Sequence, residues 1–193
     1  MTTKIAIRNL VKIYQSNIHS DGLLAVSDAN FEVHDQEFVC ILGPSGCGKS
    51  TILNIVSGLD AAFGGDVLIN NQSIRSSGYR WPRIGYVFQE PRLLPWLTVE
   101  KNIFALKCEG IPESQWKKAA YDALELVGLG GFERSYPHQL SGGMQQRASI
   151  ARSFAVDPDI LLMDEPFSAL DEITARNLRK NLLSIWDKMR KTI

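Results

Sequence analysis

Short apolar stretches separated by turn-forming residues occupy the first half of the chain, a pattern typical of β-strands. The stretches that predict strands are 5–7, 24–26, 30–33, 38–42, 65–71 and 83–88. The run 38–42, Phe-Val-Cys-Ile-Leu, contains no charged residue and predicts a buried strand. The first part of the chain is therefore expected to be rich in β-sheet.

The pattern changes to that of helices in the second half. Pro112 suits the first position of a helix, and Gly128 suits its end. Between them, apolar residues recur at helical spacing: Trp116, Ala120, Ala123, Leu124 and Val127. A second stripe follows residue 171 and consists of Leu178, Leu182, Ile185 and Met189. Both stripes predict helix faces that pack into the core.

A glycine-rich motif follows the run 38–42. The stretch 43–51, G-P-S-G-C-G-K-S-T, fits the spacing G-x-x-x-x-G-K-[ST] and opens a helical pattern. In such a loop backbone N–H groups surround a phosphate, the lysine reaches the outer phosphates and the hydroxyl ligates magnesium. The predicted phosphate-binding residues are Gly43, Pro44, Ser45, Gly46, Cys47, Gly48, Lys49, Ser50 and Thr51, with Ser50 also on magnesium. The alternative, a turn that only caps a helix, needs neither the lysine nor the hydroxyl.

A second candidate anion site lies in the string 140–147, L-S-G-G-M-Q-Q-R. Ser141 suits the N-cap of a helix, and Gly142 and Gly143 allow close backbone approach at its start. The pattern alone favours simple capping and phosphate contact equally.

Two carboxylates follow a later apolar run. Residues 160–163 predict a buried parallel strand, and Asp164 and Glu165 lie at its carboxyl end, where ligands bind in open α/β sheets. Behind a phosphate loop, we expect Asp164 to hold magnesium and Glu165 to polarise the water that attacks the γ-phosphate. The alternative is an acidic pair that closes the strand and is solvated at the surface.

Composition narrows the class of protein. The chain has 193 residues, of which 45% are hydrophobic, enough for one globular domain with a smaller lobe. Its 21 basic and 21 acidic residues balance, so charge gives no reason to expect a nucleic acid as partner. The three cysteines, Cys40, Cys47 and Cys108, lack metal-ligand spacing and favour a reducing, cytoplasmic compartment. No apolar run approaches the roughly 20 residues that span a bilayer.

Three features in order, the phosphate loop, the string 140–145 and the segment 164–171, resemble the ATP-binding subunit of ABC transporters. The resemblance covers nearly the whole chain. It implies an α/β fold with a P-loop RecA-like core, an antiparallel β lobe and an inserted helical lobe. Within one ATP-binding domain, 1–193, residues 1–90 and 156–193 would form the core and β lobe. Residues 91–155 would form the helical lobe with the signature motif.

The resemblance implies roles for residues that pattern alone does not distinguish. Tyr14 would stack on adenine, with a core tyrosine as the alternative. Gln89 would reach the magnesium and the attacking water and sense the membrane subunit. The catalytic residues are then Glu165, Gln89 and Lys49, and the magnesium ligands are Ser50, Gln89 and Asp164.

The same resemblance implies a role for the second candidate anion site, in the string 140–147. Ser141, Gly142 and Gly143 would contact the γ-phosphate of an ATP held by a second subunit. The family closes two such subunits head to tail with two ATP molecules between them. Asp171 would link the two sites across that interface.

The partners implied are a transmembrane permease subunit, a second identical or different ATP-binding subunit, and indirectly a substrate-binding protein. The chain would then be peripheral, on the cytoplasmic face of the cell membrane. The segment Leu94-Pro95-Trp96 is similar to the branch that imports nitrate, sulfonate, taurine and related anions. The alternatives are a soluble ABC ATPase of DNA or ribosome maintenance and a non-hydrolysing nucleotide-binding module of an assembly.

One departure from the family concerns the carboxyl end. The family has a switch histidine just after the strand that Lys191-Thr192-Ile193 would begin, and none of the three histidines occupies a matching place. The C-terminal part therefore looks truncated, and we expect ATP binding to survive better than turnover.

Overall fold

The structure is a computed structural model that describes residues 2–15, 22–105, 112–168, 170–189 and 191–193. Cys108 lies outside these residues. The chain forms two compact units, Met1–Pro82 with Lys191–Ile193, and Arg83–Arg190. Each unit is described by itself.

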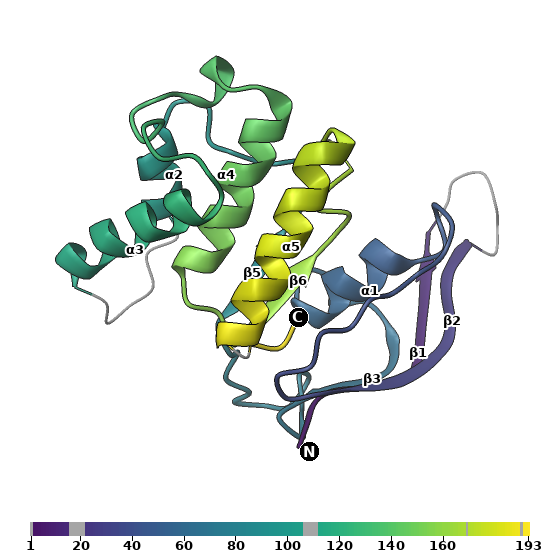
Figure 1. Cartoon of the computed structure of the whole chain (residues 1–193). Coiled ribbons are helices and arrows are strands. Elements are labelled where there is room, and N and C mark those ends of the chain that lie inside the picture. The colour runs from purple at the N-terminus through teal and green to yellow at the C-terminus, as the bar shows by residue number, and fades with distance from the viewer. Residues whose placement is uncertain (1, 16–21, 106–111, 169, 190) are drawn as a thin grey trace. The chain divides into compact units, whose positions relative to one another are not determined.

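An antiparallel sheet forms most of the first unit (Figure 1). Its strands are β1 (Thr3–Tyr14), β2 (Leu23–His34), β3 (Gly64–Ile69) and β4 (Gln72–Ser73), in the order β2-β1-β3-β4. Ile7 of β1 pairs with Phe31 of β2 and with Val67 of β3. The expected strands 5–7, 24–26 and 30–33 are thus parts of two long strands, and the antiparallel lobe is confirmed.

The core of the first unit consists of apolar side chains from this sheet and from one helix, α1 (Lys49–Val56). The buried positions are Ile5, Ala6, Ile7, Leu10, Val26, Val33, Val67 and Ile69 on the strands and Ile52, Ile55 and Val56 on α1. Each fully buried aliphatic side chain contributes about 1.5–3 kcal/mol relative to an exposed one. This core fixes the start of α1 beside the strands.

The run 38–42 is not a strand. The residues between β2 and α1 are irregular, and Leu42 is 90% exposed. Apolar composition predicts burial, but a strand also needs a neighbour for its N–H and C=O groups. None of the described strands of this unit pairs with the run. Instead, Val39 N donates to Ile193 O (2.8 Å) and Ile193 N donates to Glu37 O (2.9 Å), so the last residues of the chain hold this segment.

The second unit consists of helices and a short parallel sheet. Strands β5 (Ile84–Val87) and β6 (Ile160–Met163) are parallel, with Ile84 opposite Ile160 and Val87 opposite Met163. The helices are α2 (Val99–Phe104), α3 (Glu113–Leu126), the 3₁₀ turn η1 (Pro137–Gln139), α4 (Gly142–Ala155) and α5 (Glu172–Met189). Helix α4 packs against α2 and α3 (Figure 1).

The helical stripes and the strand 160–163 were predicted correctly. The α3 residues Trp116, Ala120, Ala123 and Leu124 are buried, as are Val127 after it and Leu178 and Leu182 of α5. The side chains of Ile185 and Met189 lie outside the described residues. Strand β6 is buried and parallel to β5, as expected of a strand that carries a ligand site at its carboxyl end.

The two compact units do not follow the expected lobe boundaries. The second unit begins at Arg83 and contains the predicted helical lobe, 91–155, together with β5, β6 and α5. The assignment of 1–90 and 156–193 to one core with its β lobe remains a prediction.

Candidate functional site

The glycine-rich stretch forms a loop that ends at the start of α1. Gly48 occupies the N-cap position with φ 93°, a left-handed conformation that favours glycine. A Cβ atom at Gly48 would lie 2.4 Å from the carbonyl oxygen of Ala25, so no larger residue fits without a backbone shift. Gly46 also has a positive φ, of 82°. The backbone is thus bent so that the first N–H groups of α1 follow directly from the loop.

Lys49 begins α1 and folds back over the loop. Its Nζ donates to the carbonyl oxygens of Gly43 (3.0 Å) and Pro44 (2.9 Å). The ammonium group and the positive end of α1 therefore lie at the same loop, which is the charge arrangement that a phosphate requires. Ser50 is exposed beside them, whereas Thr51 is buried at 9% exposure.

Tyr14, the predicted adenine-stacking residue, lies near the same helix. Its hydroxyl is 3.4 Å from Thr51 Oγ1 and 3.4 Å from Asp60 Oδ2. The side chain is 37% exposed, so it is not a fully buried core tyrosine. The first unit thus brings Tyr14 and α1 together, while the stacking role stays a prediction.

The second unit brings Gln89 and Glu165 into contact. Strands β5 and β6 end side by side, and Asp164 N donates to Val87 O (2.9 Å) just beyond their last pair. Gln89 follows β5, and its Nε2 donates to Glu165 Oε2 (3.3 Å). Neither the motif nor the spacing predicted this bond, since 76 residues separate the two side chains.

Asp164 is buried at 8% exposure, unlike the solvated carboxylate of the alternative interpretation. Burial and then the negative charge of Asp164 raise the pKa of Tyr86, so the tyrosine hydroxyl stays protonated beside it. A buried carboxylate next to a parallel strand end is a strong candidate for cation binding.

Glu165 has an unusual backbone conformation. Its φ is 44°, which is uncommon outside glycine and marks strain that the surroundings must maintain. Ser168 maintains it: both its N (3.1 Å) and its Oγ (3.0 Å) donate to the carbonyl oxygen of Glu165. Ser168 lies in the segment 164–171 that carries the family resemblance, but the sequence did not indicate this hydrogen bond.

The start of α4 confirms the predicted cap. Ser141 is the N-cap residue, and its Oγ accepts a hydrogen bond from Met144 N (3.3 Å). A Cβ atom at Gly143 would lie 3.1 Å from the Leu170 side chain, so a larger residue would crowd it. Phosphate contact stays a prediction for Ser141, Gly142 and Gly143. Capping of α4 is by itself enough to explain the serine.

Two α4 side chains that sequence analysis missed hold the segment after β5. Gln146, fully buried, donates from Nε2 to Phe88 O (3.1 Å). Arg152 donates from its two terminal nitrogens to Arg92 O (2.9 Å) and Pro91 O (3.0 Å). Carbonyls on both sides of Gln89 are thus fixed to α4.

The predicted magnesium ligands fit the chemistry of the ion. Hydroxyl, carboxylate and amide oxygens are the ligands that Mg²⁺ accepts, and Ser50, Asp164 and Gln89 supply one of each. No group of three His, Cys, Asp or Glu side chains suited to a metal occurs in the described part of the chain. Magnesium that is shared with phosphates needs only one or two carboxylates. That Ser50 and Asp164 bind the same magnesium ion remains a prediction.

Comparison with known proteins places these features in a family. The family model described as ABC transporter matches residues 26–168, which include the phosphate loop, the 140–147 string and the acidic pair. The chain belongs to the ABC transporter family. An ABC transporter ATP-binding protein of Methanocaldococcus jannaschii is 46% identical over the whole chain, which spans 71% of that protein. The aliphatic sulfonates import ATP-binding protein SsuB of Bacillus cereus is 44% identical over 87% of the chain and 65% of SsuB.

Solved structures of ABC cassettes have the same fold. The ATP-binding cassette MJ0796, in a dimeric post-hydrolysis state bound to ADP and Pi, is 34% identical with a TM-score of 0.86. The match covers 97% of the chain and 85% of that structure. CbiO1 of Clostridium perfringens, part of the transporter complex cbiONQ, is 27% identical with a TM-score of 0.82 over 100% of the chain and 77% of its own. The fold class and the resemblance predicted from sequence are confirmed, and the chain is a nucleotide-binding ABC ATPase cassette.

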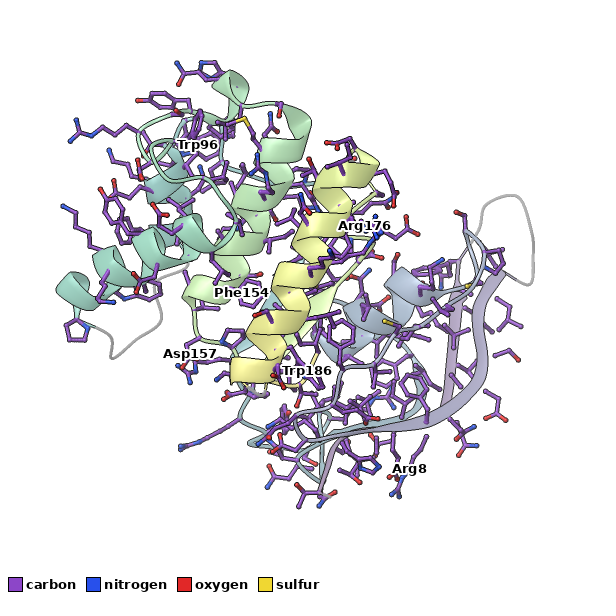
Figure 2. All side chains as sticks on the ribbon, viewed as in Figure 1. Arg8, Trp96, Phe154, Asp157, Arg176 and Trp186 are labelled. Atoms are coloured by element: carbon purple, nitrogen blue, oxygen red, sulfur yellow. The ribbon has the colours of Figure 1, made fainter. Side chains whose placement is uncertain are left out.

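One large aromatic side chain before α2 is strongly exposed. Trp96 projects from the loop before α2 and is 70% exposed (Figure 2). Among the described residues, no helix combines the length and apolar character needed to cross a bilayer.

Proposed function

We propose that the chain binds and hydrolyses ATP as the energy-coupling subunit of an ABC importer for nitrate, sulfonate, taurine or a related small anion. The main support for ATP hydrolysis is the 3.3 Å hydrogen bond between Gln89 Nε2 and Glu165 Oε2, just after the ends of two parallel strands. In this proposal, the bond joins the base, Glu165, to the sensor of the membrane partner, Gln89.

Each residue then has a distinct task in the reaction. The loop 43–48 and Lys49 hold the phosphates, Ser50 and Asp164 hold Mg²⁺, and Tyr14 stacks on the adenine. Glu165 accepts a proton from the water that attacks the γ-phosphate, and Gln89 orients the Glu165 carboxylate. Phosphoryl transfer depends mainly on such positioning and on charge stabilisation.

Coupling requires a second cassette and a permease. The dimeric post-hydrolysis state of MJ0796 with ADP and Pi supports a pair of cassettes as the hydrolytic form. In this pair, Ser141, Gly142 and Gly143 would contact the nucleotide of the opposite subunit. ATP then stabilises the closed pair, and loss of phosphate releases it.

The import branch rests on similarity and on one exposed side chain. SsuB, an aliphatic sulfonate importer subunit, is 44% identical. The strongly exposed Trp96 follows the Leu94-Pro95 pair beside the segment that carries Gln89, and an exposed tryptophan suits a protein contact. The chain would lie peripherally on the cytoplasmic face of the membrane and interact indirectly with a substrate-binding protein.

Phosphate release by Glu165→Gln tests the hydrolytic function. We expect the rate to fall at least about 100-fold, because general-base catalysis contributes about 10²–10⁴, while ATP affinity stays within about threefold. Glu172→Gln, an exposed carboxylate of α5, is the matched control and should keep the rate of the unaltered chain. An unchanged rate in Glu165→Gln would remove Glu165 from the base role, and no turnover by the unaltered chain would contradict the ATPase proposal.

A further inference from the structure

A buried ion pair supports Tyr14 from beneath. The Lys12 side chain is only 6% exposed, and its Nζ lies 2.8 Å and 2.7 Å from the two carboxylate oxygens of Asp60. It also donates to the carbonyl oxygen of Ala62 (2.6 Å). An ammonium group has three N–H donors, so these three acceptors satisfy it and fix its position.

Tyr14 rests on this fixed charge. Lys12 Nζ lies over the Tyr14 ring, 4.6 Å from its centre. At this distance the ammonium attracts the electron-rich face of the ring. The hydroxyl end is 3.4 Å from Asp60 Oδ2 and 3.4 Å from Thr51 Oγ1, contacts that are long and individually weak.

Asp60 connects this support to the end of α1. It follows the helix by a few residues, and its Oδ1 also accepts from Ala62 N (3.0 Å), which fixes the turn 60–62. The same carboxylate thus holds a loop after α1, the cation beneath Tyr14 and the Tyr14 hydroxyl. Thr51 lies in the first turn of α1, directly after Ser50.

We propose that Lys12 and Asp60 are positioning residues that hold the Tyr14 ring as a preformed stacking surface for the nucleotide base. This inference rests on the proposed nucleotide-binding function and deepens it. A ring fixed by packing and charge loses less conformational freedom when the base stacks on it, so the base binds more tightly. Breaking the pair therefore weakens recognition of the base and leaves recognition of the phosphates intact.

The test compares two ligands that differ in the base. ATP and inorganic tripolyphosphate, each with Mg²⁺, are titrated calorimetrically into the full chain and its Asp60→Asn variant. Stacking on an aromatic side chain is worth about 1–3 kcal/mol per base, a factor of about 5–150 in affinity. We expect Asp60→Asn to weaken ATP at least about fivefold and to leave tripolyphosphate within about twofold.

Further variants separate positioning from damage to the fold. Tyr14→Ala should weaken ATP in the same way, and adding Asp60→Asn to it should cause no further loss, because the stacking surface is already gone. Lys12→Met combined with Asp60→Leu removes both charges without leaving one unpaired, and should reproduce the selective loss if Asp60→Asn does not fold. Asp122→Asn removes the carboxylate of the exposed Lys118–Asp122 pair (2.7 Å) and should change neither affinity.

Two results would overturn the inference but not nucleotide binding itself. One is an equal loss of affinity for ATP and for tripolyphosphate in Asp60→Asn, which would show that the Lys12–Asp60 pair is purely structural. The other is an unchanged ATP affinity in variants that fold. If the unaltered chain bound neither ATP nor tripolyphosphate, the proposed function itself would fail.

Discussion

At the scale of the residue, the charge of Asp60 has a measurable signature in stability. Burial acts to raise the pKa of this carboxyl, but hydrogen bonds from Lys12, Ala62 and Tyr14 and the charge of Lys12 outweigh it, so the pKa is lowered. A carboxylate with a lowered pKa in the folded state stabilises the fold above its ordinary pKa of about 4, and this stabilisation is lost as pH falls through the folded value.

The corresponding prediction concerns the free energy of unfolding of Asp60→Asn. We expect it to be about 2 kcal/mol below that of the unaltered chain from pH 5 to 8, less than the ~3–5 kcal/mol of a fully buried pair. The difference should shrink below pH about 4, where Asp60 itself becomes protonated. Urea unfolding at several pH values measures this, and a difference that stays constant down to pH 2 would contradict the assignment.

Cys47 offers a chemical probe of the phosphate loop. The side chain is exposed, and its Sγ lies so close to Gly43 that a Cβ atom there would be 2.6 Å away. A group attached to this sulfur adds bulk next to Gly43 of the loop, so we expect alkylation to abolish ATP binding. Cys40, the other exposed cysteine of the described residues, provides the control.

The measurement is ATP affinity after alkylation, with the modified residue identified by mass spectrometry. The Cys40→Ala variant should lose ATP binding on alkylation as the unaltered chain does. Stoichiometric modification of Cys47 with unchanged affinity would show that the loop does not bind ATP as proposed.

At the scale of the element, helix α4 holds the segment that carries Gln89. Arg152 donates two hydrogen bonds to carbonyl oxygens of Pro91 and Arg92, and Gln146 donates one to Phe88. Hydrogen bonds from a charged donor are worth about 1.5–3 kcal/mol each. A movement of α4 would therefore move the segment that carries Gln89 with it.

Arg152→Met should release this segment. We expect amide hydrogen exchange at residues 92–94 to accelerate at least about tenfold and the free energy of unfolding to fall by about 3 kcal/mol or more, because two such bonds are lost. Arg179→Met on α5, where the arginine is half exposed, is the control and should leave exchange at 92–94 unchanged. Unaltered exchange in Arg152→Met would mean that α4 does not hold the segment.

Sequence patterns identified those elements whose signal is local. Helices α3 and α4, strand β6 and the Ser141 cap follow from spacing and capping residues close together in the chain. The run 38–42 was predicted wrongly, because its apolar composition does not provide the strand partner that a sheet requires. Sequence patterns also missed the pairs Lys12–Asp60 and Gln89–Glu165. Their partners are 48 and 76 residues apart in the chain, and only the fold brings them together.

At the scale of the whole molecule, the order of the motifs along the chain predicted the family, which no single contact does. The phosphate loop, the 140–147 string and the acidic pair occur in sequence as the family requires, and the family match includes all three. Physical chemistry alone left the second anion site open, because capping accounts for Ser141 equally well. In the proposed function, its role depends on a second copy or a related subunit.

The most direct test of the transport function is the capture of native partners from membranes. Glu165→Gln, loaded with ATP and Mg²⁺, should remain in the closed state and retain the proteins bound to that state, which mass spectrometry then identifies. We expect ATP-dependent recovery of a polytopic membrane protein, together with a substrate-binding protein for a small anion. Recovery of only ribosomal or DNA-maintenance proteins would contradict the transport function and leave the ATP chemistry standing.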